Sequence, residues 1–226
     1  MAGKLGVVLT IAALFVAPPV AAKPKHEHGK ARAAAAPSCP TTSYQYDSAG
    51  SPGSGAVNDP LFPKQWGLTQ INAPGAWARG VKGSGVTVAV VDTGVDLNHP
   101  DLQSKLVAGR DFVAGKRDCP AGPQDENGHG SHVAGIAAAA TDNGIGVAGT
   151  APDSKIMPVR VLDADGSGTV EDIVAGIRFA ADHGAKVINL SLGELPVLSQ
   201  IDPDNEAIAA AIQHAWDRGA LVVAAA

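Results

Sequence analysis

The stretch Val86-Thr87-Val88-Ala89-Val90-Val91-Asp92-Thr93-Gly94 decides the fold class of this 226-residue chain. Its first six residues are apolar or β-branched, with almost no polar alternation, which is typical of a strand buried on both faces. A strand of this kind belongs to a parallel sheet with helices on both sides. Because Asp92 follows the strand directly, we expect its carboxylate at the carboxyl edge of the sheet, where such folds place their functional sites.

Strand and helix patterns alternate along the rest of the chain. Further strands are expected at 155–162 and 186–191 and from 221 onward, although Pro158 weakens the first. Thr169 is a suitable N-cap for a helix that Gly184 ends. That helix has an apolar stripe formed by Val170, Ile173, Val174 and Ile177. A second helix, ending at Gly219, has a stripe formed by Ala207, Ile208, Ala211, Ile212 and Ala215. The sequence predicts an α/β fold with a doubly wound parallel sheet in three layers.

Composition limits the classes of protein to which the chain can belong. A hydrophobic fraction of 45% over 226 residues allows one domain with a sizeable core. Aromatic residues make up only 4%, which suits small side chains packed closely between helices and a sheet. The net charge is −5 and no large basic patch is present, so no nucleic-acid partner is expected. We expect a monomer.

The N-terminus has the pattern of a secretory signal peptide over residues 1–22. Lys4 supplies a positive charge, residues 5–16 form an apolar run too short for a membrane span, and Val20-Ala21-Ala22 precedes a cleavage site. No other stretch is long and apolar enough to cross a bilayer, so we expect a secreted protein without stable membrane association. Residues 23–57 are rich in Ala, Ser, Gly and Pro and are expected to form a flexible lead-in to a domain at 58–226.

Large and reactive side chains carry two further expectations. Trp66 and Trp77 are expected to pack onto the core, because large aromatic side chains gain most from burial. Cys39 and Cys119 would meet an oxidising compartment after secretion, where a disulfide is permitted. The sequence leaves their pairing open, because it does not show whether the two Cα atoms come close enough.

A histidine between two glycines marks the second informative stretch, Asn127-Gly128-His129-Gly130-Ser131-His132-Val133-Ala134-Gly135. The small apolar residues after it predict a tightly packed helix with His129 in its first turn. With Asp92, His129 would make the orienting carboxylate and general base that activate a serine. A zinc site on His129 and His132 stays an alternative, although the signature His-Glu-x-x-His is missing. An aspartic peptidase would need a second Asp-Thr-Gly, and the chain has none.

These motifs resemble those of the subtilisin-like serine peptidases, over residues 58–226. The aspartate block is Val90-Val91-Asp92-Thr93-Gly94-Val95-Asp96 followed by His99-Pro100-Asp101-Leu102. The stretch at 127–135 resembles the histidine block, with Ser131 where threonine is commoner. The resemblance implies a secreted serine endopeptidase that acts on peptides or proteins, with Asp92 and His129 as two members of the catalytic triad.

The same resemblance implies sites for the substrate and for calcium. Asn189-Leu190-Ser191-Leu192-Gly193 resembles the segment that pairs with the substrate. Its Ser191, Leu192 and Gly193 would lie on one side of an extended peptide, and Gly166, Ser167 and Gly168 on the other. A structural Ca²⁺ would take oxygen ligands from the side chains of Asp59, Asp101 and Asn143 and the carbonyl groups of Ala140, Ile145 and Val147. Around Asp118 and Asp125 the sequence departs from the family pattern, so no second calcium site is assigned there.

The family pattern is incomplete in this sequence. The motif Gly-Thr-Ser-Met-Ala, which carries the nucleophilic serine in the family, does not occur, and the last serine is Ser199. The final strand reaches Ala226 just before the place of the oxyanion asparagine. We therefore expect a C-terminally truncated peptidase domain that is inactive alone and has an unpaired strand at its sheet edge. The alternative function is a calcium-dependent, non-catalytic peptide-binding domain.

Overall fold

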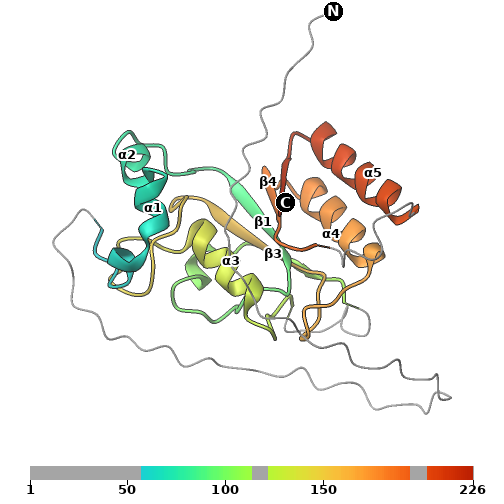
Figure 1. The fold of residues 1–226 in the computed structure, drawn as a ribbon, viewed down its shortest axis with the longest axis horizontal. Coiled ribbons are helices and arrows are strands. Elements are labelled where there is room, and N and C mark those ends of the chain that lie inside the picture. The colour runs from blue at the N-terminus through green and yellow to red at the C-terminus, as the bar shows by residue number, and fades with distance from the viewer. Residues whose placement is uncertain (1–56, 114–121, 194–202, 226) are drawn as a thin grey trace, which may run out of the picture.

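The computed structural model describes residues 57–113, 122–193 and 203–225. Within these residues, five parallel strands form one sheet in the order β2-β3-β1-β4-β5 (Figure 1). The strands are β1 (Thr87–Asp92), β2 (Arg110–Asp111), β3 (Lys155–Arg160), β4 (Val187–Leu190) and β5 (Leu221–Ala224). The apolar stretch at 86–91 thus supplies β1, the central strand, and Asp92 is its last residue.

Helices cover both faces of the sheet and make three layers (Figure 1). On one face lies α3 (His129–Ala138), whose Ala134 and Ala138 share a buried cluster with Val90 and Ile156. On the other face α4 (Val170–Asp182) and α5 (Pro203–Asp217) pack together. The remaining helices are short: η1 (Phe62–Lys64), α1 (Trp66–Gln70), α2 (Ala73–Trp77) and η2 (Gln103–Lys105). The predicted doubly wound α/β fold is confirmed.

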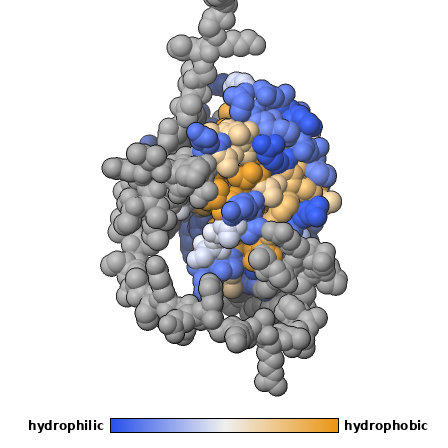
Figure 2. All heavy atoms as spheres, turned by 90° about the vertical axis from the view of Figure 1, so that its right-hand side faces the viewer, coloured by the Kyte–Doolittle hydropathy of each residue, from blue (hydrophilic) through white to orange (hydrophobic). Residues whose placement is uncertain are grey.

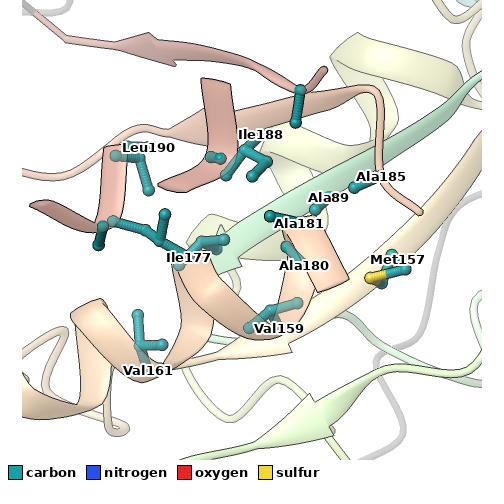
Figure 3. Close-up of a cluster of buried hydrophobic side chains, with 14 of the residues drawn as sticks. Ala89, Met157, Val159, Val161, Ile177, Ala180, Ala181, Ala185, Ile188 and Leu190 are labelled. Carbon is teal, nitrogen blue, oxygen red and sulfur yellow. The ribbon is translucent and has the colours of Figure 1, made fainter. Parts of the chain in front are cut away.

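The larger core lies between the sheet and the α4–α5 pair (Figure 3). Its fully buried members include Val159, Val161, Ile177 and Ile188, and alanines of the two helices fill the space between them. Burying one such Val or Ile side chain contributes about 1.5–3 kcal/mol. This cluster therefore fixes α4 and α5 against the sheet, and the sheet in turn fixes the strand ends.

Thr169 caps α4 as predicted, because its Oγ1 accepts a hydrogen bond of 3.2 Å from Asp172 N. The predicted stripe of α5 is only partly correct. Ala211 and Ala215 are fully buried, whereas Ala207 and Ile212 are exposed. The small residues Ala211 and Ala215 thus form the buried line of α5, and the flanking Ala207 and Ile212 face outward.

Pro158 lies inside β3, which has a strand on each side. On the β2 side, Val107 N donates to Ile156 O and Phe112 N donates to Arg160 O, both at 2.8 Å. Backbone groups two residues apart in a strand point to the same side. The missing N–H of Pro158 therefore faces the short edge strand β2, where a lost donor is tolerated, and the pairing with β1 is kept.

The two tryptophans that were expected to pack onto the core differ in exposure. Trp77 is 8% exposed and Trp66 is 78% exposed, so the prediction that both pack onto the core is wrong for Trp66. One face of α1 suffices to contact the body of the domain, and it presents the buried Leu68 instead. Val57, predicted to close the lead-in, is buried in the same small cluster as Trp77.

Large apolar side chains are exposed on the side of the molecule where α5 and β5 lie. They are Ile212, Trp216 and Leu221, and apolar surface is visible from this side in Figure 2. In the described part of the chain, no helix is both long and apolar enough to cross a bilayer. The predicted signal peptide, most of the lead-in and both cysteines lie outside the described residues.

Candidate active site

Asp92 and His129 meet at the carboxyl end of the central strand. His129 Nδ1 lies 2.8 Å from Asp92 Oδ1 and 3.0 Å from Oδ2. The aspartate side chain is fully buried, whereas 48% of the histidine side chain is exposed. Burial raises the pKa of Asp92, and hydrogen bonds from His129 and from Thr93 N offset part of that effect. The arrangement leaves the opposite nitrogen, Nε2, available for proton transfer.

The helix α3 brings His129 to this position because it packs directly onto the turn after β1. His129 is the first residue of α3, as predicted. A Cβ on Gly130 would lie 2.0 Å from Gly94 O and 3.2 Å from Asp92 Cβ. The missing side chain of this glycine therefore lets the start of the helix touch the strand end.

A second carboxylate, that of Asp125, lies beneath both elements and is fully buried. Its Oδ1 accepts hydrogen bonds from Thr93 Oγ1, Asn127 N and Gly128 N, each at 2.9 Å. Its Oδ2 accepts from Ser131 N at 2.9 Å and from Ser131 Oγ at 2.6 Å. Burial alone would raise the pKa of Asp125, but these hydrogen bonds together lower it below the usual value.

Arg160 fixes the segment that leads into Asp125 from the other side. It is the strand partner of Asp92 and is 2% exposed. Its Nη1 donates to Gln124 O at 3.1 Å, and its Nη2 donates to Glu126 Oε2. Its Nη1 also lies 3.6 Å from Asp111 Oδ2. A guanidinium can hold several acceptors in one plane, so this side chain ties the 124–126 segment to the end of β3.

Neither Asp125 nor Arg160 was assigned a role from the sequence. Asp125 stands just before a helix, where aspartate often accepts hydrogen bonds from free backbone N–H groups, and that signal could have identified it. For Arg160 the sequence offers only a basic residue at the end of a strand. Its burial depends on acidic and carbonyl groups that come from distant parts of the chain.

The predicted substrate segments leave the sheet on either side of β1. Residues 191–193 follow β4, and the β1–β4 register, in which Val90 pairs with Asn189, sets Ser191 level with Asp92. The loop with Gly166, Ser167 and Gly168 follows β3. Asn127 Nδ2 donates to Ala164 O at 2.9 Å, which joins this loop to the turn before His129. All of the predicted substrate residues thus lie at the same edge of the sheet as the Asp92–His129 pair.

The residues predicted to bind calcium also come together. Asp59 and Asp101 are 1% and 2% exposed, and the loop at 140–147 surrounds both. Asp59 accepts from Asp142 N at 3.0 Å and from Asn143 N at 3.2 Å. Asp101 accepts from Val147 N at 2.9 Å and from Asn143 Nδ2 at 2.7 Å.

This loop approaches Asp101 unusually closely. A Cβ on Gly146 would lie 2.1 Å from Asp101 Oδ2, and Gly146 has a positive φ of 58°. Burial raises the pKa of Asp59 and that of Asp101, and each accepts backbone hydrogen bonds that offset part of the effect. The repulsion between the two carboxylates adds to the rise at Asp101. The cluster is thus a closely packed set of oxygen atoms with excess negative charge.

Zinc receives no support from the structure. Over the described residues, no group of three or more His, Cys, Asp or Glu side chains could hold a metal ion. His129 uses Nδ1 for Asp92, and the side chain of His132 is exposed one turn further along α3. The predicted calcium set is of another kind, with two carboxylates and, as its other ligands, amide and carbonyl oxygens.

The geometry defines a class: an α/β protein with an aspartate–histidine pair at the carboxyl edge of a doubly wound sheet. The subtilase family model matches residues 83–226. Thermitase from Thermoactinomyces vulgaris is 51% identical over 170 residues, which cover 75% of this chain and 57% of thermitase. Subtilisin Savinase from Lederbergia lenta is 44% identical over 160 residues, which cover 71% of this chain and 54% of the relative.

A solved structure of a protease from Pseudoalteromonas arctica matches with a TM-score of 0.65 and 33% identity, over 75% of this chain and 58% of that one. The chain belongs to the subtilase family, whose members are serine peptidases. It spans a little over half the length of these relatives.

Proposed function

We propose that this chain carries the aspartate and histidine of a serine endopeptidase site. The observation that carries the proposal is the contact of 2.8 Å between His129 Nδ1 and the buried Asp92, with the histidine ring half exposed. Asp92 holds the proton on Nδ1 and stabilises the imidazolium. His129 then accepts the proton of an attacking serine at Nε2 and passes it to the leaving amine.

Within these 226 residues we assign no nucleophilic serine and no oxyanion asparagine. The family motif Gly-Thr-Ser-Met-Ala is missing from the sequence, and the chain spans a little over half of its relatives. The Asp92–His129 pair can orient and move a proton, but a peptide bond also needs a nucleophile and donors for the developing oxyanion. We therefore propose that the 226 residues alone do not hydrolyse peptides.

An extended peptide or protein segment is the proposed substrate, held between residues 191–193 and residues 166–168. Both segments follow strands that flank β1, so a peptide between them would pass over the end of β1 beside His129. Main-chain pairing with such loop edges accepts many side-chain sequences. This suits an endopeptidase that recognises the backbone of its substrate.

A structural Ca²⁺ is the proposed cofactor of the loop at 140–147. The fit rests on the donor set: two buried carboxylates whose pKa values are raised, one amide side chain and nearby carbonyl groups. Oxygen-only ligands of mixed charge suit Ca²⁺. Asp59, Asp101 and Asn143 would bind through side chains, and Ala140, Ile145 and Val147 through carbonyl groups. The ion would neutralise the two acids and hold the N-terminal segment against the loop.

Secretion is proposed from the N-terminal sequence. Residues 1–22 would be the signal peptide, 23–57 the lead-in and 58–226 the part of the peptidase domain that this chain contains. The positive charge of Lys4, the apolar run at 5–16 and the small residues before Lys23 support this division.

The function can be tested with a completed chain, made by joining these residues to the C-terminal part of a subtilase that carries Gly-Thr-Ser-Met-Ala. We expect the completed chain to hydrolyse a denatured protein substrate and to be blocked by a serine-reactive sulfonyl fluoride. The matched control is His129→Ala in the same chain, which should fold without activity. A folded completed chain that leaves the substrate intact, or that resists the reagent while active, would contradict the proposal.

A further inference from the structure

We propose that Asp125 is a positioning residue that holds His129 against Asp92, acting through Thr93 and Ser131. The inference rests on the proposed function only in that it gives the Asp92–His129 contact a catalytic use. Among the hydrogen bonds of the described site, none joins Asp125 to the ring of His129. Asp125 instead accepts from backbone N–H groups around His129 and from the side chain of Thr93, the residue after Asp92.

Asp125 links the strand end to the helix start through one oxygen. Thr93, the residue directly after Asp92, donates from Oγ1 to Asp125 Oδ1 at 2.9 Å. The same hydroxyl accepts from Gly130 N at 2.9 Å, directly after His129. The neighbours of the two paired residues are thus joined through a carboxylate and a hydroxyl.

Asp125 also holds the chain on both sides of His129. Oδ1 accepts from Asn127 N and Gly128 N before the histidine, and Oδ2 accepts from Ser131 N after it. These N–H groups lie at the start of α3, where a helix leaves its first donors without intrahelical partners. A single carboxylate therefore fixes the direction in which the first residue of α3 projects.

Ser131 extends the network to the segment beyond β1. Its Oγ donates to Asp125 Oδ2 at 2.6 Å and accepts from Asp96 N at 2.8 Å. Both Asp125 and Ser131 are buried, so water offers little competition for these hydrogen bonds. The network runs from Thr93 through Asp125 and Ser131 to Asp96, and the Asp92–His129 pair lies beside it.

Three substitutions in the 226-residue chain separate positioning from general stability. Asp125→Ala removes all five acceptor contacts. Asp125→Asn keeps an oxygen for Thr93, Asn127 and Gly128, but its amide nitrogen cannot accept from Ser131 N. Asp172→Ala is the control, since Asp172 is another buried carboxylate but lies in the first turn of α4.

The readout is NMR of chains labelled with ¹⁵N in the histidine rings and ¹³C in the aspartate carboxyl groups. The parent should show a low-field Nδ1 proton for His129. Asp125→Ala should lose that resonance, and the pKa of Asp92 should rise further, because the hydrogen bond from His129 helps to lower it. Asp125→Asn should retain a weakened resonance, and Asp172→Ala should keep it unchanged.

A low-field resonance and an Asp92 pKa that are unchanged in folded Asp125→Ala would overturn the proposal. If Asp125→Ala does not fold, Asp125→Asn and Thr93→Val decide in its place, and parent-like values in both would overturn it equally. The measurement needs no catalytic serine. It can therefore fail while the completed chain is active, or succeed while the completed chain is inactive.

Discussion

Asp125 and Asp101 are both buried carboxylates, 0% and 2% exposed, yet their pKa values are shifted in opposite directions. Asp125 accepts five hydrogen bonds from neighbouring groups, and its pKa is lowered. Asp101 accepts two from the 140–147 loop and has a second acid, Asp59, nearby, and its pKa is raised. Burial alone therefore does not assign a role to a carboxylate. A carboxylate saturated with donors organises a site, whereas one with few donors is suited to receive a cation.

The largest expected effect concerns the region around Asp125, where the proposed catalytic pair, Asp92 and His129, lies. In subtilisin, a member of the same family, loss of the triad histidine lowers kcat by about 10⁶-fold and loss of the aspartate by about 3 × 10⁴-fold. In the completed chain, the initial rate of peptide hydrolysis should therefore fall more in His129→Ala than in Asp92→Ala. His183→Ala, an exposed histidine stacked on Phe179, is the control and should keep the parent rate. Equal rates for the parent and His129→Ala would contradict the proposed role of His129 as the general base.

A second prediction contrasts the two carboxylates in stability. Asp125→Ala leaves three backbone N–H groups without their acceptor, that of the buried Ser131 and those of the more exposed Asn127 and Gly128. A buried group of this kind costs about 1–3 kcal/mol. We expect a loss of about 3–5 kcal/mol in the free energy of unfolding, after some recovery by water. Asp101→Asn in the calcium-free chain should change it by about 1 kcal/mol or less, because an unfavourable buried charge is removed along with one acceptor. Urea unfolding followed by circular dichroism measures both, and a larger loss for Asp101→Asn would contradict the contrast.

Calcium provides the third test. Saturation at about 100 times the Kd should stabilise the parent chain by about 2.7 kcal/mol. Asp101→Asn should abolish this gain, while Asp163→Asn should keep it, because Asp163 is a half-buried acid that accepts from Asp165 N in a different loop. Differential scanning calorimetry with Ca²⁺ or EDTA gives the shift in melting temperature. A parent chain with the same melting temperature in Ca²⁺ and in EDTA would contradict the proposed calcium site.

The pH dependence of that gain follows from the raised pKa values of Asp59 and Asp101. Calcium stabilisation should be full above those pKa values and should disappear as the pH falls through them, since protons then occupy the ligands. Without calcium the sign reverses: the contribution of these acids is present below their unfolded pKa and is lost as the pH rises through the folded values. For Asp125 the sign is opposite, because its pKa is lowered in the folded state. Its contribution to the free energy of unfolding is present above the unfolded pKa and is lost as the pH falls through the folded value.

A small effect is predicted outside both regions, at the start of α4. Thr169→Ala should remove the side-chain hydrogen bond to Asp172 N and cost about 1 kcal/mol of stability. Thr169→Ser should keep the hydroxyl and most of the stability. Both values can be read from the same urea curves, and a loss that exceeds that of Asp125→Ala would show that the site network is weaker than proposed.

The fold could be predicted from the sequence because its signals are local. An apolar run, a capping threonine and a terminating glycine each act within a few residues, and they located β1, α3 and α4. Trp66 could not be predicted, because exposure depends on which face of a five-residue helix meets the domain. The exposed Ile212 in α5 has the same cause.

Family motifs name Asp92 and His129 as site residues, and the structure brings these two side chains into contact. The support beneath this pair could not be predicted. Asp125 is joined to Thr93 across 32 positions of sequence, and Arg160 is joined to Glu126 across 34. Contacts at such separations arise only when strand ends and helix starts meet. Only the folded arrangement shows which polar residues organise the pair.

The most direct test of the central claim is to find which histidine of the completed chain reacts with a peptide chloromethyl ketone. Such a reagent occupies the substrate position, and its chloromethyl carbon alkylates the adjacent ring nitrogen with loss of chloride. Among the seven histidines of this sequence, we predict modification at His129 Nε2 alone, located by mass spectrometry of the digested protein. Modification at His132, or spread over several histidines without preference for His129, would contradict the assignment of His129 as the catalytic base.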